Sequence, residues 1–245
     1  MTTTPVGMRC PECARQRTRV VRAGHATTTP RVTFGLIAAN VLVFLTEQGQ
    51  FTLSGAPYGS VVEKGWLARA DISIGHRYYE LVTSAFIHAD ILHIGFNMYL
   101  LYLLGLMLEP AIGSLRFGTI YFTAMLCGAC GALVATAAPN LGASGAIFGL
   151  MGAAAVELRA RGFSVMQSGI GMLIILNLIL SVALPGISIG DHVGGLIGGA
   201  LAGAAFRAAD GRRMPALGFA ACAVLSALAV VGSLVAAQST APGFA

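Results

Sequence analysis

The sequence is organised around one stretch, Leu141-Gly142-Ala143-Ser144-Gly145-Ala146-Ile147-Phe148-Gly149-Leu150, in which a lone serine lies among glycines at the start of an apolar run. Small neighbours let other backbones approach the Ser144 hydroxyl, and a helix N-terminus offers unpaired N–H groups and a positive dipole end. Such a position suits a nucleophile. The structural alternative is a membrane-helix serine that bonds back to its own carbonyl groups among packing glycines. The rest of the chain has to decide between the two interpretations.

Composition places the chain in a membrane. Hydrophobic residues occupy 56% of the 245 positions and charged residues only 10%. A soluble domain of this length cannot bury so much apolar surface. The net charge of +5 is compatible with nucleic acid or with an anionic membrane face, and its distribution along the chain favours the membrane. We therefore expect the lipid bilayer, and no nucleic acid, as a partner.

Seven apolar runs predict an all-α fold, a polytopic membrane helical bundle. The runs lie at 32–46, 91–108, 117–138, 144–156, 165–184, 193–206 and 216–237. The fourth and the sixth are short for a hydrocarbon core, which needs roughly 20 residues. The mixed segment 48–90 is too polar to span and carries aromatic side chains, which predicts a structured loop in the membrane interface.

The distribution of arginine predicts the topology. Residues 1–31 form a polar segment with six arginines, which the positive-inside rule places in the cytoplasm. Seven spans then put the short tail, 238–245, outside. On this topology twelve of the 15 basic residues are cytoplasmic, and the six beyond the N-terminal segment are Arg116, Arg159, Arg161, Arg207, Arg212 and Arg213.

The N-terminal segment also carries a cysteine pair, Cys10-Pro-Glu-Cys13, with the spacing of a zinc knuckle. It offers two ligands, where a closed tetrahedral site needs four, and His25 is a possible third. The alternatives are a site that has lost its upstream pair or a start codon that lies earlier. We expect no metal and no cofactor for the chemistry of the core.

Polar side chains within the predicted spans are few, and intramembrane ionisable groups are functional candidates by default. They are His93 and Asn97, Ser144, and Asp191 with His192. The spacing of four places His93 and Asn97 on one helix face. A rise of 1.5 Å per residue puts Ser144, His192, His93 and Asn97 at one level, about 10 Å below the outer surface.

Glycines allow the helices that carry Ser144 and His192 to touch. The sixth run has Gly195, Gly199 and Gly203 at four-residue intervals, and the fourth has Gly145 and Gly149. Close packing of small residues is typical of membrane helix interfaces. The pattern predicts that the Ser144 hydroxyl lies within reach of the His192 imidazole.

Three motifs on separate spans together resemble the rhomboid family of intramembrane serine proteases. They are His88-Ala-Asp-Ile-Leu-His93-Ile-Gly-Phe-Asn97, Gly142-Ala-Ser144-Gly and His192-Val-Gly-Gly-Leu-Ile-Gly, in the order of the family. The resemblance covers about residues 32–237 and implies a six-helix protease domain with a seventh, C-terminal helix.

The resemblance also implies the roles of the site residues. Ser144 is then the nucleophile and His192 the general base. An oxyanion hole is formed by His93, Asn97 and the backbone N–H of Ser144, and Gly142 shapes the turn before the nucleophile. The physical logic agrees, because a serine hydroxyl needs a base and a tetrahedral intermediate needs donors in a site of low dielectric. Asp191 is not expected to orient His192, since adjacent helical residues do not face each other.

The loop motif before the second span departs from the family. Tyr79-Glu80 stands where many bacterial relatives have Trp-Arg, and a glutamate cannot donate the hydrogen bonds of an arginine. The anchoring of the first loop is therefore left open by the sequence. For His88 the sequence favours a contact that orders this loop over a role in the chemistry.

The function that this resemblance implies is serine endopeptidase activity on transmembrane segments of other membrane proteins, cut near the outer face. Two other classes stay open. One is a catalytically inactive relative that binds transmembrane clients, against which the retention of both Ser144 and His192 argues. The other is a small transporter or channel with a proton relay, which lacks a visible inverted repeat and has few intramembrane acids.

Overall fold

The structure is a computed structural model that describes residues 2–4, 7–9, 29–47, 60–136 and 138–239. Cys10, Cys13 and His25 lie outside the described residues, so the structure does not test the predicted zinc ligands. Two three-residue strands, β1 (Thr2–Thr4) and β2 (Gly7–Arg9), pair antiparallel in the N-terminal segment. The rest of the described chain forms helices and loops, which confirms the predicted all-α bundle.

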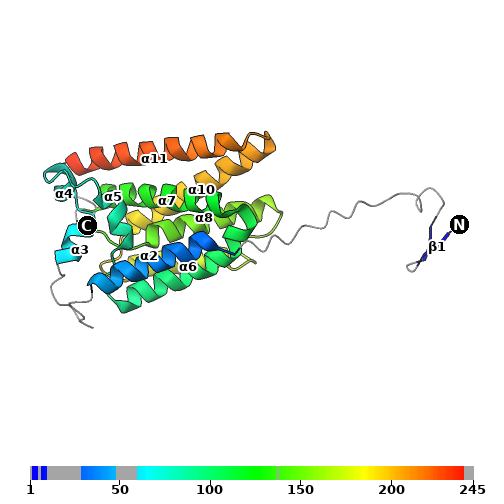
Figure 1. The fold of residues 1–245 in the computed structure, drawn as a ribbon, viewed down its shortest axis with the longest axis horizontal. Helices are drawn as coiled ribbons and strands as arrows, with labels where there is room; N and C mark the ends of the chain where they lie inside the picture. Colours follow the sequence, from blue (N-terminus) through cyan, green and yellow to red (C-terminus); the bar gives the residue numbers. More distant parts are fainter. Residues whose placement is uncertain (1, 5–6, 10–28, 48–59, 137, 240–245) are drawn as a thin grey trace.

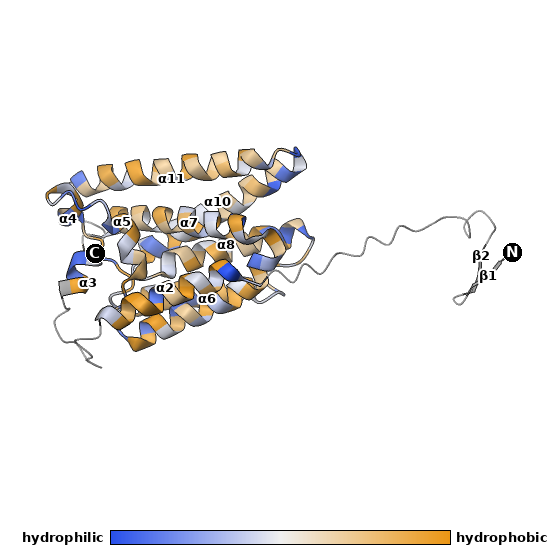
Figure 2. Ribbon diagram, viewed as in Figure 1, coloured by the Kyte–Doolittle hydropathy of each residue, from blue (hydrophilic) through white to orange (hydrophobic). Residues whose placement is uncertain are grey.

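In the part of the chain that the structure describes, seven helices of 14 residues or more run alongside one another (Figure 1). They are α2 (Arg31–Glu47), α6 (Ile91–Ile112), α7 (Ser114–Ala135), α8 (Ser144–Ala160), α9 (Ile170–Ala183), α10 (Ile189–Gly211) and α11 (Pro215–Gln238). Of the described helices, α6, α7, α10 and α11 are long and apolar enough to cross a membrane, and α2 and α9 are shorter apolar helices. Figure 2 shows that hydrophobic residues dominate the middles of the helices. The chain is a membrane protein.

The helices begin and end a few residues away from the predicted runs, and α10 differs most. It begins at Ile189 and not at 193, because Ser188 caps its N-terminus by accepting a hydrogen bond from the Asp191 N–H at 3.2 Å. Asp191 and His192 therefore lie in its first turn. α7 ends at Ala135, and the described residues between it and α8, 136 and 138–143, form no helix, as expected of a segment with proline and glycine.

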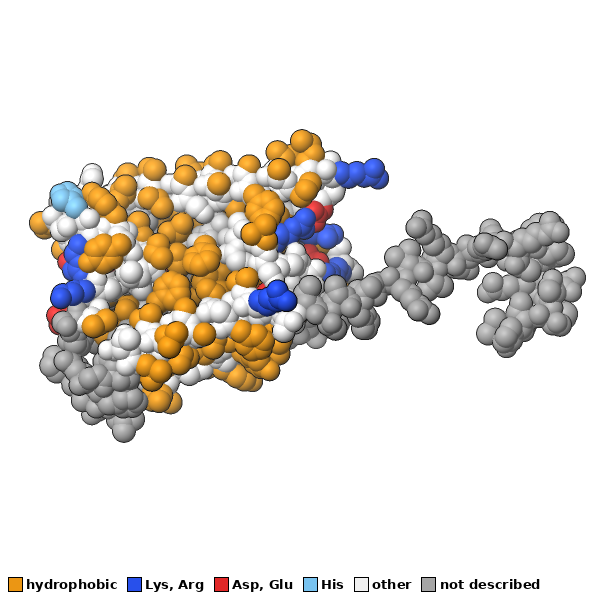
Figure 3. Space-filling view, viewed as in Figure 1, with side chains coloured by type: hydrophobic (Ala, Val, Ile, Leu, Met, Phe, Trp, Pro, Cys, Tyr) orange, Lys and Arg blue, Asp and Glu red, His pale blue; other side chains and the backbone are white. Residues whose placement is uncertain are grey.

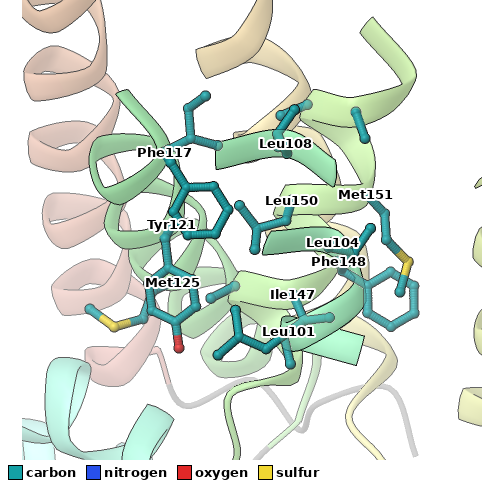
Figure 4. Packing of buried hydrophobic residues seen from close by; sticks show 14 of the residues in the cluster. Leu101, Leu104, Leu108, Phe117, Tyr121, Met125, Ile147, Phe148, Leu150 and Met151 are labelled. Carbon is teal, nitrogen blue, oxygen red and sulfur yellow. The ribbon is translucent and has the colours of Figure 1, made fainter. Parts of the chain in front are cut away.

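The core lies where α6, α7 and α8 meet. Figure 4 shows Phe117 and Tyr121 of α7 directed toward Leu150 of α8, with Leu101 and Leu104 of α6 beside them. All five side chains are buried. α10 packs against α8 through glycines instead of large side chains, as predicted from their spacing, and its glycines also contact α7.

The N-terminus of α2 is held by a carboxylate from another helix. The first turn of α2 has unpaired N–H groups and no acidic residue of its own. The buried Glu109 of α6 accepts hydrogen bonds from the backbone N–H of Val32 at 3.0 Å and of Thr33 at 2.8 Å. The hydroxyls of Thr33 and Ser114 also donate to this carboxylate, each at 2.6 Å. This arrangement ties α2 to the end of α6 and the start of α7.

The described part of the polar segment before α6, residues 60–90, is a structured loop, as predicted. It contains α3 (Ser60–Gly65), α4 (Arg69–Ser73), α5 (Glu80–Thr83) and the 3-10 helix η2 (Ser84–Phe86). Leu67 in this loop exchanges two backbone hydrogen bonds, of 2.8 and 2.9 Å, with Asn140, which precedes the turn before Ser144. The loop is thus bound directly to the segment that carries the candidate site.

Arg77 organises this loop around the buried Glu80. Its guanidinium donates to the Tyr79 hydroxyl at 2.8 Å and to the Glu63 carbonyl at 3.0 Å, and it forms an ion pair with Asp71 at 3.2 Å. Arg77 Nε also lies 2.8 Å from Glu80 Oε1. The arginine that anchors the loop therefore stands three positions before the residue at which the family pattern has one.

Candidate active site

The turn before Ser144 is shaped by Gly142, which has a φ of +118°. Residues with a Cβ rarely adopt this conformation, so glycine is required for the turn. The Gly142 N–H donates to the Ser84 carbonyl of η2 at 2.8 Å. Ala143, the N-cap residue of α8, makes no side-chain capping bond. Ser144 therefore opens α8 directly after this turn, at the positive end of the helix dipole.

His93 and Asn97 of α6 face this turn. A Cβ placed on Gly142 would lie 2.7 Å from His93 Nε2 and 3.7 Å from Asn97 Nδ2. Asn97 is buried, and its Nδ2 has no hydrogen-bond partner among the described residues. Burying an amide without a partner costs free energy, so this donor is available to an acceptor on a ligand that enters the site. The predicted spacing on one helix face thus brings both residues to the turn before Ser144.

His88 packs against His93 from the loop that precedes α6. Their rings are in edge contact, with centroids 5.0 Å apart. His88 is buried, and its Nδ1 lies 3.3 Å from the Phe86 carbonyl. These contacts agree with the expectation that His88 orders the loop.

His192 lies in the first turn of α10 with its ring stacked on Phe148 of α8. The ring centroids are 4.2 Å apart and the ring planes differ by 22°. Phe148 follows Ser144 by four residues, so it lies one turn further along the same face of α8. His192 Nδ1 is 2.5 Å from the Ser181 hydroxyl of α9.

The Ser144 hydroxyl itself is bound to Asp191 and not to His192. Ser144 Oγ donates to Asp191 Oδ2 at 3.3 Å, and the structure gives no hydrogen bond between Ser144 and His192 among the residues it describes. The Asp191 carboxyl also interacts with the Asn140 side chain and the Gly145 backbone N–H. It fits against Gly145 because a Cβ there would overlap the carboxylate. The predicted reach from Ser144 to His192 thus stays a prediction.

Two residues of this site were missed as contacts by sequence analysis. Ser181 lies in an apolar helix, and no local pattern connects it with a histidine eleven positions later. The sequence marks Asp191 as an intramembrane functional candidate, but it does not indicate a contact with Ser144. It instead faces across to α8, and this contact depends on how α8 and α10 pack rather than on spacing within one helix.

These features define a membrane-embedded helical bundle with a serine at a helix N-terminus, a histidine on the neighbouring helix and an unpaired amide donor at the same turn. The family model for the Rhomboid domain matches residues 75–209, which is more than half of the chain. The chain belongs to the rhomboid family.

Several known proteins are similar to this chain. RHOMBOID-like protein 7 of Arabidopsis thaliana is 34% identical over 122 residues, 49% of this chain and 39% of that protein. Rhomboid protease GluP of Bacillus subtilis is 30% identical over 174 residues, 66% of this chain and 32% of GluP. Inactive RHOMBOID-like protein 8 of Arabidopsis thaliana is 30% identical over 128 residues, 51% and 36% of the two chains. The matches thus span between about a third and two fifths of these relatives' lengths.

Proposed function

We propose that this chain is an intramembrane serine endopeptidase that cleaves transmembrane segments of other membrane proteins near the outer face. Ser144 acts as the nucleophile and His192 as the general base. The observation that supports the proposal most is the buried Asn97 amide without a partner, beside the turn that presents Ser144. Rhomboid protease GluP adds support by its name, because it shares this region of sequence.

The reaction requires the Ser144 hydroxyl to turn from Asp191 toward His192 Nε2. His192 then takes the hydroxyl proton while Ser144 Oγ attacks the scissile carbonyl. The oxyanion accepts hydrogen bonds from the Asn97 amide, the His93 ring and the Ser144 backbone N–H. The proton on His192 passes to the leaving amine, and water, activated by the same imidazole, hydrolyses the acyl-enzyme.

The substrate must unwind to reach Ser144, since a helix keeps its carbonyl groups bonded within itself. Transmembrane segments with small or helix-weakening residues near the outer face are therefore the expected substrate class. The bilayer is the second partner. We propose no cofactor for this chemistry.

A non-catalytic role is the second candidate, and the bond from Ser144 to Asp191 favours it. A hydroxyl held by a carboxylate is directed away from its base. Inactive RHOMBOID-like protein 8 provides a named example of such a relative. In this alternative the site binds a transmembrane client without cutting it.

The deciding experiment compares Ser144→Ala, His192→Ala and the double variant in single-turnover cleavage of a panel of tagged transmembrane segments in liposomes. If both residues serve one step, each single variant loses cleavage and the double variant is scarcely worse than either. A fluorophosphonate probe should label the native protein at Ser144 only. Cleavage by either single variant, with contaminating protease excluded, or an unlabelled native protein that cuts no segment, would contradict the proposal.

The topology belongs to the same proposal, because the cut near the outer face requires that the N-terminus of α8 lies toward that face. A reporter fused near residue 5 should be cytoplasmic, and one fused after Gly243 should be external. The physical reason is the concentration of arginine at the opposite ends of the helices. Both reporters on one side would remove a span and contradict this orientation.

A further inference from the structure

A cavity of about 170 Å³ opens between the ends of α6, α7, α8 and α10. It lies at the opposite end of α8 from Ser144, because its α8 residues are at the C-terminal end of that helix. Its apolar lining includes the buried residues Leu108, Ile120 and Ala153. Its charged lining residues are Arg116, Arg161, Arg207, Glu157 and Asp210.

The two carboxylates do not saturate the three guanidinium groups. Arg116 donates both terminal nitrogens to Asp210, at 2.8 and 2.7 Å, and Arg161 Nε donates to Glu157 at 2.6 Å. Arg207 makes no hydrogen bond to any residue that the structure describes, and its Nε lies 3.9 Å from Glu157. Each guanidinium has five N–H donors, so most donors of Arg161 and Arg207 are available.

The cavity lies at one end of the helical bundle, where membrane-crossing helices would meet lipid headgroups. Its charged residues occupy the ends of helices that are long enough to cross the membrane, among them α7 and α10. Figure 3 shows charged side chains at the ends of the bundle and a broad hydrophobic surface between them. The side chains of Arg161 and Arg207 are 46% and 44% exposed, so a ligand reaches them from outside.

We propose that this cavity binds a phosphate group, supplied by an anionic phospholipid headgroup or by a soluble phosphate. Planar guanidinium groups pair with phosphate through two parallel hydrogen bonds, and basic pockets between membrane helices suit anionic headgroups. Glu157 and Asp210 hold Arg161 and Arg116 in place, and the excess positive charge of Arg207 is left for the ligand.

The test uses the full-length protein with three single variants. Arg207→Gln and Arg161→Gln each remove one proposed phosphate ligand. Arg159→Gln is the matched control, because it removes the same charge from the same end of α8 without lining the cavity. Native mass spectrometry measures retention of dioleoylphosphatidylglycerol and of zwitterionic dioleoylphosphatidylcholine. Thermal unfolding in detergent compares sodium phosphate with sodium chloride at equal ionic strength.

We expect Arg207→Gln and Arg161→Gln to reduce retention of phosphatidylglycerol about tenfold, with no change for Arg159→Gln or for phosphatidylcholine. Stabilisation by inorganic phosphate that is lost in the same two variants, without lipid retention, would assign the site to a soluble phosphate. Equal behaviour of all three variants toward both probes would overturn the proposal.

A second inference concerns the proton on His192, and it rests on the proposed function. The Ser181 hydroxyl donates its single proton to the Asn177 carbonyl at 2.6 Å. Its contact with His192 Nδ1 at 2.5 Å must therefore be one in which the serine oxygen accepts. This requires a proton on Nδ1, which leaves Nε2 of the neutral ring as the acceptor.

We infer that Ser181 is a positioning residue that holds His192 in the tautomer needed to take the proton of Ser144. Phe148 fixes the plane of the ring by stacking, and Ser181 fixes its rotation and the place of its proton. The group that orients His192 for its reaction with Ser144 is thus a neutral hydroxyl from α9, and not an acid.

The test replaces Ser181 by Ala and by Thr. Ser233→Ala is the matched control, because Ser233 is also buried and donates to the carbonyl four residues earlier, at 2.8 Å, but lies in α11. We expect Ser181→Ala to lower kcat about tenfold with little change in KM, Ser181→Thr to restore it, and Ser233→Ala to have no effect.

Nitrogen-15 NMR of labelled His192 provides a readout that does not depend on cleavage, recorded in the Ser144→Ala background. The native Ser181 should give a protonated Nδ1, and Ser181→Ala should give a mixture of tautomers. An unchanged tautomer together with unchanged kcat would overturn this inference alone. Full activity of Ser144→Ala or His192→Ala would instead overturn the proposed function.

Discussion

α9 and α10 both contribute to the candidate site, and they are held in very different ways. α10 meets α8 backbone to backbone, since a methyl group on Gly195 would overlap the Gly145 carbonyl and one on Gly199 the Gly149 carbonyl. α9 buries only Ile170, Gly171, Asn177 and Ser181. The tight contact of α8 with α10 thus fixes the relative position of Ser144 and His192. Ser181, which orients the imidazole, comes from the loosely packed α9.

The strongest way to break this comparison is to force α8 and α10 apart. Gly199→Ala should destabilise the bundle by about 3 kcal/mol or more, because the neighbour of the new methyl group is backbone that cannot move aside. Thermal unfolding in detergent measures the loss, and cleavage activity should fall with it.

Gly35→Ala in α2 is the matched control, because a Cβ there meets nothing within 4 Å. Alanine is a better helix former than glycine, so this variant should be as stable as the native protein or slightly more stable. Equal stability of Gly199→Ala and Gly35→Ala would show that the contact of α8 with α10 is more adaptable than the structure indicates.

The next largest effect concerns the proposed oxyanion donors on α6, which face the tightly packed N-terminus of α8. Asn97→Ala should lower kcat by roughly 10²–10³, since one oxyanion donor is lost, and should leave membrane insertion intact. The measurement is cleavage of several transmembrane substrates with thermal unfolding alongside. Full activity with all of them would mean that the unpaired Asn97 amide has another purpose.

The sequence predicted the parts of this site that depend on spacing within one segment. His93 and Asn97 are four apart on α6, and the structure places both against Gly142. The glycine intervals predicted the contact of α8 with α10. The described residues between α7 and α8 and between α9 and α10 form no helix, and the proline and glycine there are local signals of irregular backbone.

The sequence did not predict contacts that depend on the rotation of one helix against another. Ser181 is a small polar residue in an apolar helix, and only the approach of α9 to α10 makes it a partner of His192. Asp191 likewise contacts Ser144 only because the first turn of α10 faces α8. The loop around Glu80 depends on Arg77, and a substitution of one family residue does not reveal which other residue replaces it.

Asp191 allows a sharper test of the contact between α8 and α10, because its carboxyl binds the Ser144 hydroxyl. Asp191→Asn keeps an oxygen that accepts from the Ser144 hydroxyl but removes the negative charge. We expect activity equal to that of the native protein or several-fold higher, because an amide holds the hydroxyl less strongly and does not repel the oxyanion. Rates of fluorophosphonate labelling and of cleavage measure the effect. A loss as large as that of Ser144→Ala would mean that Asp191, and not His192, is the base.

The smallest effect is expected in the first loop, where burial raises the pKa of Glu80 to about 7, further raised by Asp71 and opposed by Arg77. The proton of the Arg77 Nε is directed at the Tyr79 hydroxyl, so compensation of the Glu80 charge is incomplete. The unfolded carboxyl has a pKa of 4.5, and it therefore releases its proton first as the pH rises. Stability contributed by the protonated carboxyl is full below about 4.5 and is lost as the pH approaches 7.

The unfolding temperature of the native protein in detergent should therefore fall by a few degrees between pH 5 and pH 8, as Glu80 ionises. Glu80→Gln should lack this part of the pH dependence, because the amide keeps the buried shape without a titrating group. Glu63→Gln is the control, since Glu63 is an exposed acid of the same loop. If the native protein and Glu80→Gln lose the same stability over this range, the carboxyl is ionised throughout, and Arg77 compensates its charge fully despite the direction of its Nε proton.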